Sequence, residues 1–145
     1  MDLIDGIQNS FGLGLKDAQT TMLASIARTR EFDGGEVIIR QFDRNSDLIL
    51  LLDGRAKIYG YSGKEIREVG AGSVFGEISL VDDQPRSASV ISAGKSKVAI
   101  FGSKELRAIL MKNPDIAARI YENVARVLCS RLRVATIEMD GLMSK

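Results

Sequence analysis

Residues 48–72, LILLLDGRAKIYGYSGKEIREVGAG, contain three short β-rich runs that are separated by glycine turns. The runs are Leu48 to Leu52, Ala56 to Tyr61 and Glu65 to Val69, and the turns contain Gly54, Gly63 and Gly70-Ala71-Gly72. Similar runs lie before and after this stretch, at Val37 to Ile39, Ser87 to Ile91 and Val98 to Phe101. Regularly spaced short strands with glycine turns are typical of an antiparallel roll or barrel.

Helical patterns flank this β-rich part on both sides. Before it, apolar residues recur at helical spacing, at Leu15, Ala18, Met22 and Ile26. After it, Asn113 is a predicted N-cap and Pro114 takes the first helical position, where proline is favoured. No helix breaker follows until Gly141, which predicts a long last helix.

Together these patterns predict an α+β (mainly β) fold, an antiparallel β-roll or jelly roll flanked by an N-terminal helix and two C-terminal helices. One domain is expected over residues 1–145. Within it we expect a helical part at 1–30, the roll at 31–102 and the C-terminal helices at 103–140.

The composition argues against an enzyme. The chain contains no histidine, so the commonest general base and metal ligand is missing. A metal enzyme built on a jelly roll, which generally needs histidines, is therefore disfavoured, and no metal is expected. The one cysteine, Cys129, allows no internal disulfide, which suits a reducing, cytoplasmic setting.

Charge and hydropathy exclude two further classes of partner. The formal net charge of +1 leaves no global electrostatic footprint for nucleic acid, so no direct nucleic-acid partner is expected. The longest apolar run, Leu48 to Leu52, is far too short to cross a membrane, so no membrane partner is expected. The acidic N-terminus also lacks the pattern of a signal peptide.

Residues 74–90, VFGEISLVDDQPRSASV, contain the most specific chemistry of the chain. Gly76 permits a close backbone approach, and the residues after it can form one helical turn whose N–H groups suit an anion. Glu77 can accept hydrogen bonds from sugar hydroxyls, and the guanidinium of Arg86 suits phosphate oxygens. The residues therefore describe a sugar-phosphate site, with a plain Glu77–Arg86 ion pair as the alternative.

This stretch resembles the phosphate-binding cassette of the cyclic nucleotide-binding domain family, whose pattern is F-G-E, a short loop, then P-R-[ST]-A-[ST]-V. The matching residues are Phe75, Gly76, Glu77, Leu80, Pro85, Arg86, Ser87, Ala88, Ser89 and Val90. The resemblance extends over nearly the whole chain, through Gly35-Glu36-Val37-Ile38, Gly54, Gly70-Ala71-Gly72 and Asn113-Pro114-Asp115-Ile116. One departure is Gln41-Phe42-Asp43, where the family often has E-G-D.

The resemblance implies a role for each residue of the cassette. Glu77 would bind the ribose 2′-hydroxyl, and Arg86 would pair with the cyclic phosphate. The backbone N–H groups of Ile78 and Ser79 would cap phosphate oxygens, and Ser87 would add a hydroxyl. The rest of the implied nucleotide site consists of Phe75, Gly76 and Ala88.

The last helix supplies one more candidate. At 100° per residue one face is apolar, with Ile116, Ala117, Ile120, Tyr121, Val124, Val127 and Leu128. Arg131 falls at the centre of this face, where a charge must pair, snorkel or meet a ligand. Some family members place an arginine of this helix over the base, so Arg131 is our candidate lid residue. A pair with Glu138 or a frayed helix end is the alternative.

The combined prediction is a stand-alone, non-catalytic sensor domain without an attached DNA-binding or catalytic domain. It would bind a cyclic nucleotide, with cyclic AMP favoured over cyclic GMP, and its last helix would respond to the ligand. The partner would be an unidentified effector protein, and the chain a monomer or a homodimer through the last helix. The alternatives are an interaction domain that keeps the fold without the nucleotide, and the regulatory fragment of a larger protein.

Overall fold

Two four-stranded sheets form the roll, and all of their described strand pairs are antiparallel. The structure is a computed structural model that describes residues 1–144, with the side chains of Ile78 and Ser79 outside the description. The first sheet contains, in spatial order, β1 (Ala27–Phe32), β8 (Ser96–Phe101), β3 (Leu48–Asp53) and β6 (Val74–Phe75). The second contains β2 (Val37–Ile39), β7 (Ser89–Ser92), β4 (Arg55–Tyr59) and β5 (Glu65–Gly70).

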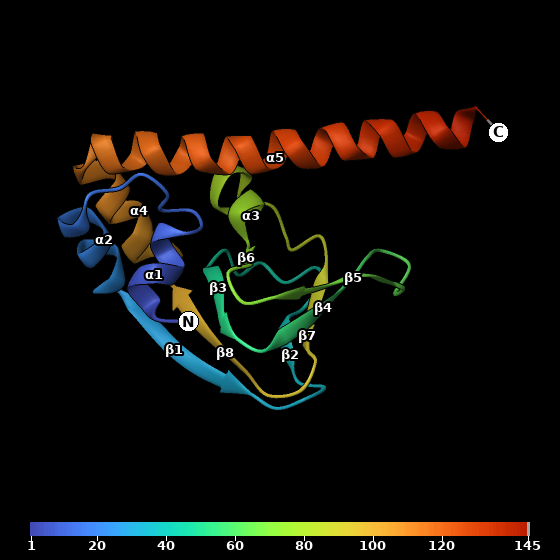
Figure 1. The fold of residues 1–145 in the computed structure, drawn as a ribbon, viewed down its shortest axis with the longest axis horizontal. Helices are drawn as coiled ribbons and strands as arrows, with labels where there is room; N and C mark the ends of the chain where they lie inside the picture. The colour runs from blue at the N-terminus through green and yellow to red at the C-terminus, as the bar shows by residue number, and fades with distance from the viewer. Residues whose placement is uncertain (145) are drawn as a thin grey trace.

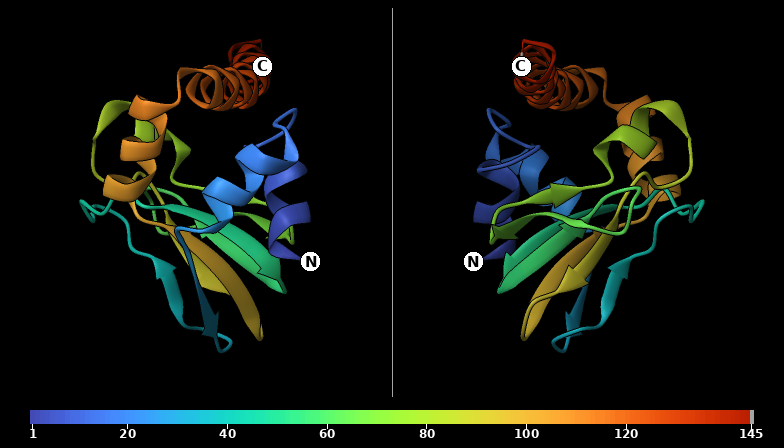
Figure 2. Two further views of the ribbon diagram at one scale, coloured as in Figure 1. Left: turned by 90° about the vertical axis from the view of Figure 1, so that its left-hand side faces the viewer. Right: turned by 90° about the vertical axis from the view of Figure 1, so that its right-hand side faces the viewer.

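The helices gather at one end of the roll (Figure 1). They are α1 (Leu3–Gln8), α2 (Asp17–Ala24), α3 (Glu77–Asp82), α4 (Ser103–Lys112) and α5 (Pro114–Met143). The long α5 lies across this end, with α1, α2 and α4 beneath its first half, and its second half extends past them. Figure 2, which views α5 nearly end-on, places the other helices between α5 and the tips of the sheets.

This architecture confirms the predicted fold class, and three local predictions need correction. The helical pattern before the roll ends earlier than expected, because α2 stops at Ala24 and residues 27–30 belong to β1. The side chains of Arg28 to Glu31 are exposed, so this strand has no alternating apolar pattern to reveal it. Its pairing with β8, which is remote in sequence, decides its conformation instead.

The other two corrections concern α5. The helix continues through Gly141 to Met143 because a single glycine weakens a helix without breaking it. Asn113 is the N-cap residue by position, but its side chain makes no cap bond. Its Nδ2 instead donates to the carbonyl oxygen of Ile109 at 2.9 Å, which ties α5 to the end of α4.

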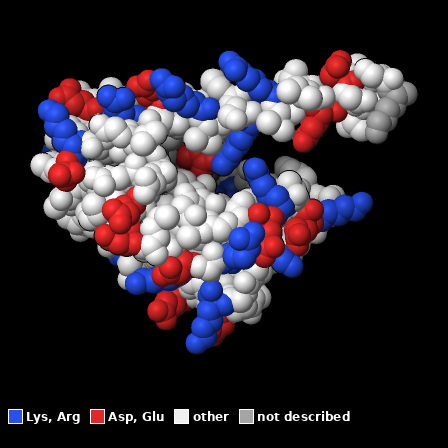
Figure 3. All heavy atoms as spheres, in the orientation of Figure 1, with Lys and Arg blue, Asp and Glu red and all other residues white. Residues whose placement is uncertain are grey.

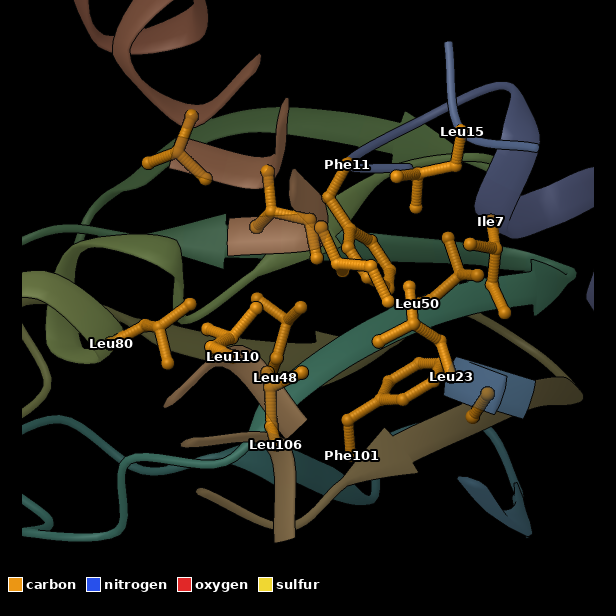
Figure 4. Packing of buried hydrophobic residues seen from close by; sticks show 14 of the residues in the cluster. Ile7, Phe11, Leu15, Leu23, Leu48, Leu50, Leu80, Phe101, Leu106 and Leu110 are labelled. Carbon is orange, nitrogen blue, oxygen red and sulfur yellow. The ribbon is translucent and has the colours of Figure 1, made fainter. Parts of the chain in front are cut away.

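The central strand β3 separates two apolar clusters. Successive side chains of a strand point to opposite faces, and both faces of β3 are covered. Leu48 and Leu50 pack with the helices and with Phe101, as Figure 4 shows. Ile49 and Leu51 face the interior of the roll, together with Phe75. The uninterrupted apolar run of β3 is therefore explained by burial on both sides.

The two halves of α5 differ in burial. In the first half Ile116, Ile120 and Val124 are buried against the helical cluster. Tyr121 and Val127, which the helical count placed on the same face, are exposed. From residue 129 to residue 144 every side chain is exposed, and no residue of this range belongs to the two apolar clusters.

Candidate functional site

The cassette begins with a sharp turn between β6 and α3. Gly76 has φ +90°, a left-handed conformation that residues with a side chain rarely adopt. A Cβ atom at this position would overlap the guanidinium of Arg86 and lie 2.6 Å from the carbonyl oxygen of Asp47. Glycine is therefore required here, both for the backbone conformation and for the close approach of Arg86.

Arg86 is almost completely buried, with 5% of its surface exposed. Its Nη2 atom donates to the backbone carbonyl of Asp47 at 2.6 Å. Its Nε and Nη1 atoms have no hydrogen-bond partner among the described residues. Burial lowers the pKa of Arg86, and the carboxylates of Asp47, Asp43 and Glu77 oppose this shift. The site thus holds a desolvated cation with two unused donors, an arrangement that an anion would complete.

Backbone hydrogen bonds hold Arg86 in place. The N–H of Arg86 donates to the carbonyl oxygen of Asp43 at 2.8 Å, and the N–H of Phe42 donates to the carbonyl oxygen of Arg86 at 2.8 Å. Asp47 connects this segment to α4, because its carboxylate accepts from the N–H of Ser103 at 2.9 Å. The position of the guanidinium is therefore set by the main chain of the roll.

Glu77 is the second buried charge, with 4% of the residue exposed. Its Oε1 atom forms an ion pair with Nη1 of Arg131, which reaches it from α5. The Arg131 side chain is 42% exposed, so one partner is buried and the other is partly in water. Figure 3 shows acidic and basic side chains meeting in a hollow beneath α5. The predicted alternative partner of Arg131, Glu138, makes no such contact in residues 1–144.

Most of the predicted site residues line one cavity of about 200 Å³. They are Phe75, Gly76, Glu77, Arg86, Ser87, Ala88 and Arg131. Phe75 also packs into the roll interior, so it serves the core as well as the cavity wall. The backbones of Ile78 and Ser79 lie in the first turn of α3, and their side chains are outside the described part of the chain.

Other residues of the cavity were not predicted from the sequence. Apolar side chains line it from the strands, at Ile39, Ile58, Ile66, Val74 and Val90. These belong to the β-rich runs, so their strand pattern could have indicated them. Arg67 of β5 also lines the cavity, and it forms no ion pair with the described residues. Nothing in the motif pointed to Arg67 or to the carbonyl of Asp47, because both come close only through folding.

A second contact joins α4 to the cassette. Nη2 of Arg107 donates to the carbonyl oxygen of Leu80 at 3.0 Å and to Oδ1 of Asp83 at 2.8 Å. Asp83 follows the end of α3 and has φ +58°, which is common at helix C-termini. Arg107 therefore caps α3, while Asp47 connects α4 to Arg86, so α4 holds both ends of the cassette.

The described residues contain neither a metal-binding cluster nor a membrane-spanning helix. In residues 1–144 no group of three or more His, Cys, Asp or Glu side chains is placed to hold a metal ion. None of the described helices is long and apolar enough to span a membrane.

The family comparison agrees with this geometry. Residues 29–113 match the family described as Cyclic nucleotide-binding domain. The matched region contains the whole roll from β2 onward, the cassette and α4. It covers more than half of the 145 residues, so the chain belongs to the cyclic nucleotide-binding domain family.

Relatives with described functions support the same family. The chain is 36% identical over 96 residues to a cGMP-dependent protein kinase of Plasmodium berghei, and the aligned segment covers 66% of this chain and 11% of that protein. It is 28% identical over 133 residues to the Cyclic AMP receptor protein of Thermus thermophilus, covering 89% of this chain and 60% of that protein. The chain thus spans less than two thirds of the length of these relatives.

Solved structures share the fold. The Catabolite Activator Protein of Thermus thermophilus has a TM-score of 0.79 at 27% identity, over 92% of this chain and 62% of that one. A cyclic nucleotide-binding domain from Methylobacillus flagellatus has a TM-score of 0.82 at 21% identity, over 94% of this chain and 79% of that one. The second likeness shows the fold alone, whereas the first agrees with the family match.

Proposed function

We propose that this chain is a non-catalytic regulatory module that binds a cyclic nucleotide in the cavity beside the cassette. The observation that carries the proposal is Arg86, a buried guanidinium whose Nε and Nη1 donors face no partner among the described residues. A cyclic phosphate would supply the missing acceptors and the missing negative charge at once. The N–H groups of Ile78 and Ser79 would add donors, and the hydroxyl of Ser87, at the cavity wall, would add another.

Glu77 would bind the ribose 2′-hydroxyl. Its carboxylate lines the cavity and has one oxygen in contact with Arg131. A carboxylate has two oxygens and about four lone-pair sites, so it can accept from Arg131 and from a hydroxyl together. Bound ribose would then be connected to α5 through a single carboxylate, and Arg131 would lie at the mouth of the cavity as a lid.

This connection supports a sensor whose last helix responds to the ligand. A ligand shifts a helix between two positions when it binds one of them more tightly. The Glu77–Arg131 pair supplies such a difference, because a shift of α5 that breaks it leaves Glu77 buried without its partner. The exposed second half of α5 would present the response to an effector protein.

Cyclic AMP is the proposed nucleotide. The Thermus thermophilus relative is named a Cyclic AMP receptor protein, and its match covers 89% of this chain. Cyclic GMP is the second candidate, and Arg67 favours it. Arg67 lines the cavity without an ion-pair partner among the described residues, and the fork of a guanidinium suits the O6 and N7 acceptors of guanine.

We also propose a homodimer through α5. A row of residues beside the buried face, which shares Leu128 with the helical cluster, follows the alternating three- and four-residue spacing of a coiled coil. The row consists of Tyr121, Ala125, Leu128, Leu132, Ala135, Met139 and Leu142. Leu132, Met139 and Leu142 are 62–71% exposed, which fits a seam that a second copy would cover.

Calorimetric titration of the purified chain with cyclic AMP and with cyclic GMP tests the proposed function. We expect saturable binding of at least one nucleotide, with the tighter one identifying the ligand. Arg86→Ala should weaken that binding by about a hundredfold or more, since the phosphate loses its buried counter-charge. Arg133→Ala, which removes an exposed arginine of α5, is the matched control and should bind normally.

Two outcomes would contradict the proposal. If neither nucleotide produces heat or a thermal shift at millimolar concentration, the chain is an interaction domain that keeps the fold without the ligand. If Arg86→Ala binds as tightly as Arg133→Ala, the nucleotide occupies a different part of the molecule.

A further inference from the structure

The loop between β2 and β3 contains an unusual backbone conformation. Phe42 has φ +71°, in the left-handed region that is an outlier for a bulky residue. It stands at the middle position of Gln41-Phe42-Asp43, in a loop whose residues 40–47 contain no glycine. Its side chain is 59% exposed, so burial in the core does not explain why phenylalanine occupies this position.

The ring of Phe42 has one aromatic partner in the described chain. It packs edge-to-face against Tyr61, with 5.4 Å between ring centroids and an angle of 82° between planes. Tyr61 is itself 78% exposed and lies in the turn between β4 and β5. Two exposed aromatic rings from segments far apart in sequence thus contact each other on the surface.

One ring belongs to a loop that holds a wall residue of the proposed nucleotide cavity, and the other belongs to a hairpin that forms part of the wall. The N–H of Phe42 donates to the carbonyl oxygen of Arg86, so the loop that contains Phe42 holds Arg86, the proposed phosphate-binding residue. The β4–β5 hairpin, which carries Tyr61, also contributes Ile66 and Arg67 to the same cavity. The aromatic contact therefore joins the wall with Arg86 to the wall formed by the hairpin.

We propose that the Phe42–Tyr61 pair is a strut that positions these two walls against the bound nucleotide. The inference rests on the proposed function and adds two positioning residues that the cassette motif does not contain. Backbone strain persists where the surrounding structure holds it, and it gathers at functional sites. The strained Phe42 places a ring where glycine would leave none, and that ring holds the hairpin over the cavity.

Substitutions at Phe42 separate the ring from the strain. Phe42→Gly removes both, and Phe42→Ala removes the ring but keeps a side chain in the left-handed region. We expect both variants to bind the nucleotide about two- to tenfold more weakly, the range of one aromatic pair, mainly through faster dissociation. Phe42→Gly should keep or raise the melting temperature, whereas Phe42→Ala should lower it.

Substitutions at Tyr61 test the partner ring. Tyr61→Ala should weaken binding as Phe42→Gly does, and the double variant should be no weaker than either single one. Tyr61→Phe keeps the ring and should bind like the wild type. A purely structural role would lower the affinity and the melting temperature together, so the pattern of Phe42→Gly is the decisive readout.

The control is Met111→Ala, which removes an apolar side chain of α4 that is 85% exposed and lies outside the cavity lining. It should bind like the wild type. Wild-type affinity in Phe42→Gly and Tyr61→Ala, or additive losses in the double variant, would overturn the strut while the wild type still binds. Failure of the proposed function would be seen in the titration of the wild-type chain, which would then bind neither nucleotide.

Discussion

The two sides of the cavity are built in different ways. On the Arg86 side, the guanidinium is held by the main chain of the roll, through Asp43 and Asp47. On the α5 side, Glu77 is held by Arg131, a flexible side chain on a helix whose second half is exposed. Both charges are buried to a similar extent, so the difference lies in what holds them.

This difference gives the two sides of the cavity separate roles in the proposed function, one in binding the ligand and the other in responding to it. A guanidinium fixed by backbone hydrogen bonds can bind an anion without rearrangement, which favours affinity. The first half of α5 is packed against the helical cluster, whereas its second half is exposed and contacts the cassette through the Arg131–Glu77 ion pair, so a ligand that binds Glu77 can act directly on this half, which favours signalling. The cassette is therefore expected to stay in place when the ligand binds, and α5 is expected to move.

The largest expected effect concerns the free half of α5. Leu132→Glu combined with Met139→Glu would place like charges opposite each other in the proposed coiled-coil seam. We expect a complete change from dimer to monomer in analytical ultracentrifugation. Arg133→Glu, a charge change outside the seam, is the control and should remain dimeric. A wild-type chain that sediments as a monomer would reject the seam, and α5 would then be free on its own.

The next effect tests the fixed side of the cavity. Gly76→Ala forces a left-handed alanine into contact with Arg86 and the Asp47 carbonyl, so we expect a loss of about 3 kcal/mol in the free energy of unfolding. Urea denaturation measures this loss. Gly63→Ala has a similar φ of +79° but meets no atom within 4 Å, so it isolates the backbone cost and should lose less. Equal losses in the two variants would mean that the approach of Arg86 adds nothing.

The smallest effect tests the movable side. Arg131→Ala should weaken nucleotide binding by about three- to tenfold, because a partly exposed ion pair contributes about 1 kcal/mol. Amide hydrogen exchange of α5 should no longer change on adding nucleotide. Arg126→Ala, whose partner Glu122 is on the same helix, serves as the control and should keep the exchange response. Unchanged affinity and an intact response in Arg131→Ala would reject the lid.

Sequence patterns predicted most of the fold because its main signals are local. Glycine turns and short apolar runs define β3, β4 and β5 within one or two residues of their observed bounds. The pattern missed β1 and β6, since the first is an exposed edge strand and the second has two residues. β1 is a strand because it pairs with β8, and β6 is a strand because it pairs with β3. Pairing between remote segments leaves no local sequence pattern.

In the cassette, too, some residues were predicted from the local sequence, whereas their contacts depend on the folded structure. Its motif indicated Glu77 and Arg86, because a phosphate and a sugar demand particular side chains at short spacing. The helical count also placed Arg131 on the inward face of α5. That Arg131 contacts Glu77 rather than Glu138 follows from how α5 crosses the roll.

Local chemistry thus determined the β-roll and the cassette of this protein, since turns, strand periodicity and a phosphate-binding motif depend on neighbouring residues. Folding decided which groups complete the site: the Asp47 carbonyl on Arg86, Arg107 on Leu80 and Asp83, and Phe42 on Tyr61. These contacts join residues that are distant along the chain, and their geometry depends on the packing of whole elements. The opposite anchoring of Arg86 and Glu77 is therefore a property of the tertiary structure.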